Sequence, residues 1–150
     1  MKTFCPEAKL VLAGEAAWLS QAILDAGKKS TYQHDIIFTG RVSFETLRAL
    51  YQGARAFTFP SLYEGFGIPV LEAFASRIPV LTGDNSSLPE VAGQAALLAQ
   101  VDQVDDIAEK MRELWQDETL RLELIQKGSI QLEQFSWDKC AEETLAYILS

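Results

Sequence analysis

Short apolar runs alternate with helical segments along this chain of 150 residues. This order predicts an α/β fold with a parallel sheet and helices on both faces. The apolar runs are continuous rather than alternating, as expected for parallel strands covered on both sides. The segments between them carry apolar residues at helical spacing. With 48% hydrophobic and 23% charged residues, the composition fits one globular domain spanning residues 1–150.

Five strands and the helices between them are expected. The strands are placed at residues 9–13, 35–39, 56–59, 79–82 and 95–99. A first helix is expected over 18–26, ended by Gly27 and by the two lysines that follow it. A second begins after Ser43, which would cap it, with Glu45 in its first turn.

Later helices have their own start signals. A short helix is expected from about Pro69 to Ser76. Ser87 and Glu90 have the spacing of a capping box, which predicts another helix start. Three helical segments follow residue 102. The last is opened by Ser136 and carries an apolar stripe of Cys140, Leu145 and Ile148.

The loop between the third strand and the next helix combines features of an anion site. Gly65 and Gly67 allow a ligand to approach the backbone, and amides at a helix start favour an anion. Pro69 suits the first position of that helix. Glu72 can accept hydrogen bonds from vicinal hydroxyls such as those of a ribose, while Glu64 faces the same ligand from the loop. The alternative is that Glu72 only complements the helix dipole and Glu64 is a solvated loop residue.

The residues around these two glutamates carry a resemblance to a known family. The string from Pro60 to Ala73, with the segments 79–82 and 85–93, resembles the donor-site signature of retaining GT-B glycosyltransferases, the glycosyl transferase group 1 family (family four). Roughly residues 9–148 are similar to its carboxyl-terminal domain, a Rossmann-like parallel sheet that forms half of a GT-B fold. Segment 85–90 looks like that of mannosyltransferase members.

The resemblance implies a nucleotide-sugar donor, transfer with retention, and a role in polysaccharide or glycoconjugate synthesis. GDP-mannose is slightly favoured, with a UDP-sugar left open. Glu72 matches the carboxylate that holds the ribose, and Glu64 matches the one near the sugar, either catalytic or positioning. Loop 40–44 matches the segment that contacts the base, with Val42 as its direct contact. The full set of donor-binding residues implied is Val42, Ser43, Phe44, Glu64, Gly65, Phe66, Gly67, Ile68 and Glu72.

Charge and composition exclude several classes of function. A net charge of −8 argues against nucleic acid as a partner. A single histidine, His34, and two distant cysteines, Cys5 and Cys140, offer neither metal-ligand spacing nor a disulfide framework. No metal or other cofactor is expected. The absence of a signal peptide and of a membrane span predicts a cytoplasmic location.

Part of the family's donor site is not matched. No Arg-x4-Lys pair that would compensate the diphosphate precedes Lys9, and Arg41 is the nearest basic candidate. The amino-terminal acceptor domain and the first strand-helix unit also lack a match. The chain is therefore expected to fold, to bind donor weakly and to be inactive alone, either as a fragment of a longer enzyme or as a stand-alone domain. A non-catalytic nucleotide-sugar module and a GT-B-fold sugar-nucleotide epimerase are the alternatives.

Overall fold

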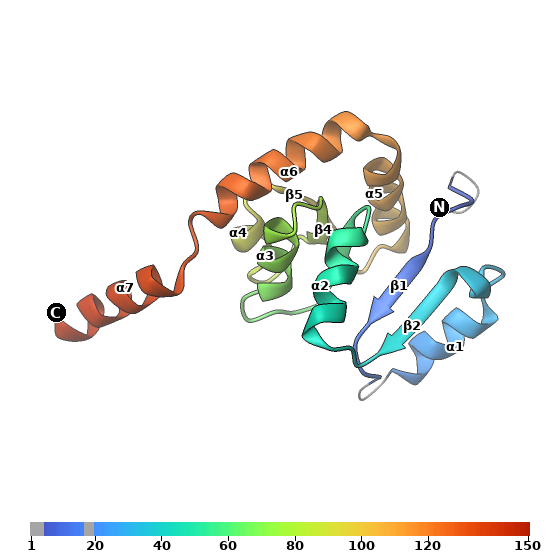
Figure 1. Cartoon of the computed structure of the whole chain (residues 1–150), viewed down its shortest axis with the longest axis horizontal. Helices are drawn as coiled ribbons and strands as arrows, with labels where there is room; N and C mark the ends of the chain where they lie inside the picture. The colour runs from blue at the N-terminus through green and yellow to red at the C-terminus, as the bar shows by residue number, and fades with distance from the viewer. Residues whose placement is uncertain (1–4, 17–19) are drawn as a thin grey trace. The chain divides into compact units, whose positions relative to one another are not determined.

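The chain has an α/β fold in which every strand pair among the described residues is parallel (Figure 1). The computed structural model describes residues 5–16 and 20–150. The chain divides into two compact units, residues 1–50 and 51–150. Each of the five expected strands is present, within one residue of its expected start. The strands belong to two sheets rather than one, the first of two strands and the second of three.

The first unit is built on a two-stranded parallel sheet. β1 (Leu10–Ala13) pairs with β2 (Ile36–Gly40), with Leu10 opposite Ile36. The connection between them contains α1 (Gln21–Lys29) and a short 3-10 helix, η1 (Gln33–Asp35). The first part of the expected helix over 18–26 lies outside the described residues.

Gly27 does not end the first helix, contrary to the sequence-based expectation. The helix continues to Lys29, and Gly27 is buried on the side that faces β2. A Cβ atom at Gly27 would lie 2.7 Å from the ring of Phe38. Glycine is therefore present because α1 packs closely on a strand, and the two lysines form the helix's last turn.

The apolar strands of the first unit are not covered on both faces by the described residues, which corrects the expectation for this unit. More than a third of the surface is exposed at each of Leu10, Val11, Ile37 and Phe38.

The second unit contains a three-stranded parallel sheet of order β3-β4-β5. Its elements are β3 (Phe57–Phe59), α3 (Ile68–Ala75), β4 (Val80–Gly83), α4 (Leu88–Ala92), β5 (Ala96–Ala99), α5 (Val104–Gln116), α6 (Glu118–Leu132) and α7 (Trp137–Leu149). α2 (Phe44–Gly53) runs from the first unit into the second, which begins at Tyr51. All four residues of the central strand β4 are buried, as the continuous apolar run predicts.

Helices α5 and α6 complete the core of the second unit. A cluster of Leu81, Ala99, Leu114 and Leu124 joins β4 and β5 to these two helices. α3 packs on α6 at Gly128, where a Cβ atom would lie 2.7 Å from the Phe74 ring. The expected helices after residue 102 are confirmed, and Ser136 caps α7 by accepting a hydrogen bond from the Lys139 amide at 3.1 Å.

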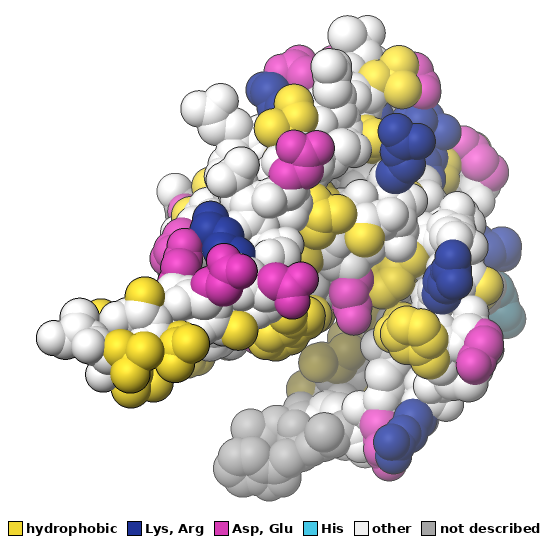
Figure 2. All heavy atoms as spheres, turned by 60° about the vertical axis from the view of Figure 1, so that its left-hand side comes forward, with side chains coloured by type: hydrophobic (Ala, Val, Ile, Leu, Met, Phe, Trp, Pro, Cys, Tyr) yellow, Lys and Arg dark blue, Asp and Glu magenta, His cyan; other side chains and the backbone are white. Residues whose placement is uncertain are grey.

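The apolar stripe of α7 is not buried as its periodicity predicts. Every residue of α7 is exposed, including Leu145 and Ile148. The face shown in Figure 2 carries hydrophobic side chains as well as acidic and basic ones. Across residues 5–16 and 20–150, no helix is both long enough and apolar enough to cross a bilayer.

Replacing Gly128 by alanine adds a methyl group that overlaps the buried Phe74 ring, at a cost of about 1–3 kcal/mol. The gain of about 1 kcal/mol in helix propensity offsets part of this cost, so the second unit is expected to lose up to about 2 kcal/mol of unfolding free energy. Gly53→Ala is the control, since a Cβ atom there meets nothing within 4 Å. Urea unfolding of the two variants measures the difference. Equal stability of G128A and G53A would contradict the close packing of α3 on α6.

Candidate functional site

The loop between β3 and α3 lies at the carboxyl edge of the second unit's sheet. It ends in a glycine, Gly67, at a position that disfavours any other residue. Gly67 has φ +105°, in the left-handed region, and immediately precedes α3. A Cβ atom there would lie 2.9 Å from the side chain of Leu88. The helix begins at Ile68, so Pro69 occupies its second position rather than the first. In the first turn of α3, Pro69 has no amide proton and the Val70 amide donates to the Gly67 carbonyl at 2.9 Å.

A second loop, residues 84–87, follows β4 and is hydrogen-bonded to the first. The Asn85 side-chain amide donates to the backbone carbonyl of Ser61 at 3.2 Å and to that of Leu62. The Ser86 hydroxyl accepts a hydrogen bond from the Glu64 amide at 3.1 Å. Adjacent parallel strands end at the same edge, so their loops meet where α/β sheets bind ligands.

Ser87 does not cap α4, so the expected capping box is wrong. Its backbone already has helical angles, and its side chain accepts no capping hydrogen bond. The hydroxyl instead lies 3.0 Å from the carbonyl oxygen of Glu64 and 2.8 Å from that of Phe66, and donates to them. A serine that caps a helix and a serine whose hydroxyl binds a neighbouring loop can have the same Ser-x-x-Glu spacing. Only the position of the loop before α3 distinguishes the two.

Gly83, at the end of β4, admits the second loop into this position. A Cβ atom on Gly83 would collide with the Asn85 side chain and would lie 2.7 Å from Cγ1 of Val101. A larger residue at this position would push Asn85 away from the loop before α3.

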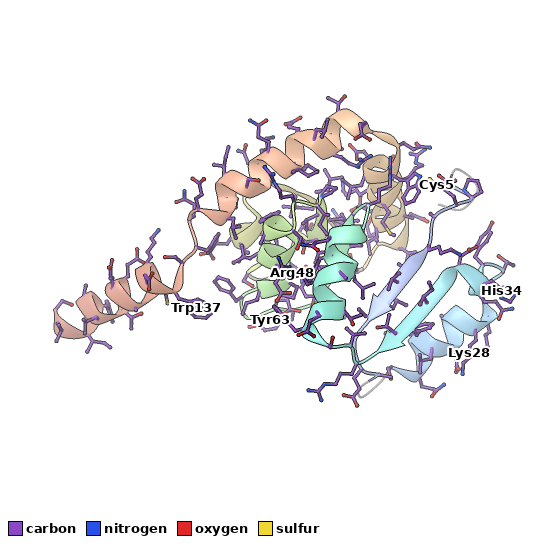
Figure 3. All side chains as sticks on the ribbon, viewed as in Figure 1. Cys5, Lys28, His34, Arg48, Tyr63 and Trp137 are labelled. Carbon is purple, nitrogen blue, oxygen red and sulfur yellow. The ribbon has the colours of Figure 1, made fainter. Side chains whose placement is uncertain are left out.

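Glu64 is half-buried, and a neutral hydroxyl holds its carboxylate. The Ser61 hydroxyl donates to Oε1 of Glu64 at 2.8 Å and also lies 3.2 Å from the Tyr63 carbonyl. Among the described residues, no cation pairs with Glu64, and its Oε2 has no protein partner. The Tyr63 side chain is 79% exposed on the same loop (Figure 3). Glu64 therefore has one carboxylate oxygen available to a ligand.

Glu72 is held in a similar way by a residue that the sequence analysis missed. The Tyr51 hydroxyl donates to Oε2 of Glu72 at 2.9 Å, and the Tyr51 ring packs on Phe57 at 5.2 Å between centroids. Burial raises the pKa of Tyr51 above its ordinary value, and so do its hydrogen bond to Glu72 and the negative charge of that carboxylate. A buried tyrosine in an apolar stripe needs a partner for its hydroxyl, which is the signal that could have identified Tyr51.

The loop expected to contact the base belongs to the first unit. Gly40 has φ +64°, and Val42, Ser43 and Phe44 follow it. Ser43 caps α2 as expected, since its hydroxyl accepts a hydrogen bond from the Thr46 amide at 3.2 Å. Hydrogen bonds from its own backbone amide and from the Ser43 hydroxyl lower the pKa of the Glu45 carboxyl. Phe44 is largely exposed.

The second unit thus has the architecture of α/β domains with parallel strands, a class in which ligands bind beyond the carboxyl ends of the strands. The family profile described as "Glycosyl transferases group 1" matches residues 2–131, and the chain belongs to this family. The resemblance inferred from the sequence is therefore confirmed.

Two curated relatives are mannosyltransferases of Escherichia coli. The chain is 38% identical over 136 residues to "O-antigen chain mannosyltransferase B", covering 91% of this chain and 36% of the relative. It is 39% identical over 106 residues to "Serotype-specific mannosyltransferase WbdA", covering 71% of this chain and 13% of that protein. The chain therefore spans only a minor part of the length of these relatives.

A solved structure confirms the GT-B type of fold. Sucrose-phosphate synthase from Thermosynechococcus elongatus superposes with a TM-score of 0.82 at 21% identity, covering 93% of this chain and 37% of that one. At this identity the similarity concerns the fold alone.

Replacing Tyr51 by phenylalanine is expected to cost about 1.5–3 kcal/mol of unfolding free energy at neutral pH, because a hydrogen bond to a charged carboxylate is lost. The loss shrinks as the pH rises above about 10, where tyrosine ionises in the unfolded chain. The folded pKa of Tyr51 is raised, so the wild type's stabilisation is present below this pH and disappears above it. Chemical unfolding at several pH values measures the effect.

Tyr147→Phe is the matched control, because the Tyr147 side chain is 84% exposed. It is expected to change stability by less than about 0.5 kcal/mol at every pH. If Y51F and Y147F are equally stable at pH 7, the hydrogen bond between Tyr51 and Glu72 contributes nothing.

Proposed function

We propose that this chain is the donor-binding domain of a retaining glycosyltransferase, which moves a sugar from a nucleotide-sugar to an acceptor. One observation carries this proposal. Glu64 and Glu72 each have one carboxylate oxygen held by a hydroxyl, from Ser61 and Tyr51, while the other has no protein partner among the described residues. Glu64 lies in the loop between β3 and α3, and Glu72 lies within α3, beyond its first turn.

Glu72 is proposed to bind the ribose of the donor. A fixed carboxylate with a free oxygen is a suitable acceptor for a sugar hydroxyl. Tyr51 donates to one oxygen and so orients the carboxylate before a ligand arrives. This orientation lowers the entropy lost on binding.

Glu64 is proposed to lie near the donor sugar, and the loop amides near the diphosphate. The backbone of Gly65, Phe66, Gly67 and Ile68 leads directly into the start of α3. The dipole of this helix end and the loop amides of Gly65 and Gly67, which have no protein acceptor among the described residues, favour a phosphate group. As the bond to the sugar breaks, negative charge grows on the diphosphate and positive charge grows on the sugar. Amides stabilise the first charge and a carboxylate stabilises the second.

GDP-mannose is the proposed donor. Both curated relatives described above are named as mannosyltransferases, and segment 85–90 supports the same choice. The base is proposed to contact Val42, Ser43 and Phe44 of the first unit. The acceptor is proposed to bind a second domain of the enzyme, and the chain alone is proposed to hold donor weakly without turnover.

Glu64→Gln is expected to lower the rate of mannose transfer by the complete gene product at least about 100-fold, because the carboxylate charge is lost where positive charge develops. Glu72→Gln is expected to raise the KM for donor about 10-fold with a smaller effect on kcat, because a charge-assisted hydrogen bond is weakened. Glu142→Gln, at an exposed position of α7, is the control and should leave both constants unchanged. Steady-state kinetics with GDP-mannose and UDP-sugars provides the measurement.

The same experiment separates the alternatives. Donor binding by calorimetry without transfer would favour a non-catalytic module, and isomerised donor would favour an epimerase. If the NMR spectrum shows that the anomeric configuration of the product is opposite to that of the donor, retention is contradicted. No binding of any sugar nucleotide would overturn the proposed function.

We also propose that donor binding needs no metal ion, since loop amides supply the donors for the diphosphate. Transfer by the complete protein is therefore expected to proceed at the same rate in excess EDTA as in excess Mg²⁺. A rate that falls about 10-fold or more in EDTA and recovers with Mg²⁺ would contradict this.

A further inference from the structure

We propose that Ser87 is a positioning residue that orients two peptide groups of the loop before α3, so that the amides of Gly65 and Gly67 face the donor. This inference rests on the proposed function and adds a residue to it that acts through the loop rather than by touching the donor. It is carried by the contacts of one hydroxyl with two carbonyl groups.

The Ser87 hydroxyl lies between two carbonyl oxygens of the loop, 3.0 Å from that of Glu64 and 2.8 Å from that of Phe66. One hydroxyl proton is shared between these two acceptors. Both carbonyl groups must therefore point towards residue 87, on the side of the second loop.

The geometry of the peptide group determines where the neighbouring amides point. In a planar trans peptide the C=O and the N–H point in opposite directions, and the described residues contain no cis peptide bond. The Glu64 carbonyl shares its peptide group with the Gly65 amide, and the Phe66 carbonyl shares its group with the Gly67 amide. Both amides consequently point away from Ser87.

These two amides lack acceptors in the described part of the chain, where neither donates to a protein atom. Gly67 is itself buried. A buried amide without an acceptor is unfavourable unless water or a ligand accepts its hydrogen bond. Two donors directed to the same side match the oxygen atoms of a diphosphate or a sugar.

Ser86 of the same second loop also binds this stretch. Its hydroxyl accepts a hydrogen bond from the Glu64 amide at 3.1 Å. The amide and the carbonyl group of Glu64 are thus bound by two consecutive serines. Ser86 has φ +52°, a left-handed conformation that is strained for a residue other than glycine. Ser87 immediately precedes α4, but its side chain does not cap that helix and instead contacts the loop before α3. These features are unusual for a turn whose only task is to connect β4 with α4.

The test compares Ser87→Ala with Ser129→Ala in the complete gene product. Ser129 is the matched control, because its half-buried hydroxyl also donates to a backbone carbonyl, that of Ile125 at 3.1 Å, within α6. We expect S87A to lower kcat/KM for GDP-mannose about 10- to 100-fold. S129A should leave it unchanged, with a similar melting temperature for both variants. Ser87→Thr, which restores a hydroxyl, should recover most of the activity.

Amide hydrogen exchange provides a readout that does not depend on activity. In S87A, peptides covering residues 60–67 are expected to exchange about 10-fold faster than in the wild type, with the rest of the chain unchanged. S129A should leave these peptides unaffected. Unchanged exchange at 60–67 in S87A would overturn the positioning role, even if the wild type showed no transfer.

The remaining outcomes distinguish this inference from the proposed function. Faster exchange at 60–67 with full transfer activity in S87A would show that the orientation of the loop does not serve the donor, and would overturn the inference alone. Faster exchange throughout S87A would also overturn it, since Ser87 would then stabilise the whole unit. A wild type that neither binds nor transfers any sugar nucleotide would remove the proposed function, and with it the donor-facing role of the two amides.

Discussion

The burial of β4 is the constraint on which the second unit depends. All four residues of this strand are buried, and the strand lies between β3 and β5. Its carboxyl end is thereby fixed, and the loop of residues 84–87 starts from a rigid position. That loop in turn holds the connection from β3 to α3 through hydrogen bonds from Asn85 and Ser87 and to Ser86. The packing of β4 and the hydrogen bonds of the loop that follows it thus determine the position of Glu64.

The two glutamates are held by hydroxyl groups, and this choice has chemical consequences. A bidentate arginine would have occupied both oxygens of each carboxylate, whereas Ser61 and Tyr51 each bind one oxygen. The partners also come from different places, since Ser61 lies in the same loop as Glu64 and Tyr51 lies on α2. The orientation of Glu72 therefore depends on tertiary packing, including the contact of Tyr51 with Phe57.

The sequence was informative wherever a local pattern determined the outcome. Continuous apolar runs located all five strands, and Ser43 and Ser136 cap the helices as predicted. The predictions failed where a distant residue decided. Gly27 was predicted to end a helix because glycine followed by lysines is a common stop signal. Its contact with Phe38 is made in the folded chain and is not visible in the local sequence. Ser87 matched a capping box because the same spacing is produced when the hydroxyl binds another loop. Whether the donor-binding residues act as the resemblance implies stays a prediction.

Two opposing effects on stability meet at Ser86. Its left-handed backbone would be relaxed by glycine, the residue that most easily adopts this conformation, but glycine would remove the hydroxyl that accepts a hydrogen bond from the Glu64 amide. A glycine at position 86 would therefore exchange backbone strain for an amide without its partner. The loop before α3 thus owes one of its anchors to a backbone conformation that serine adopts only at a cost.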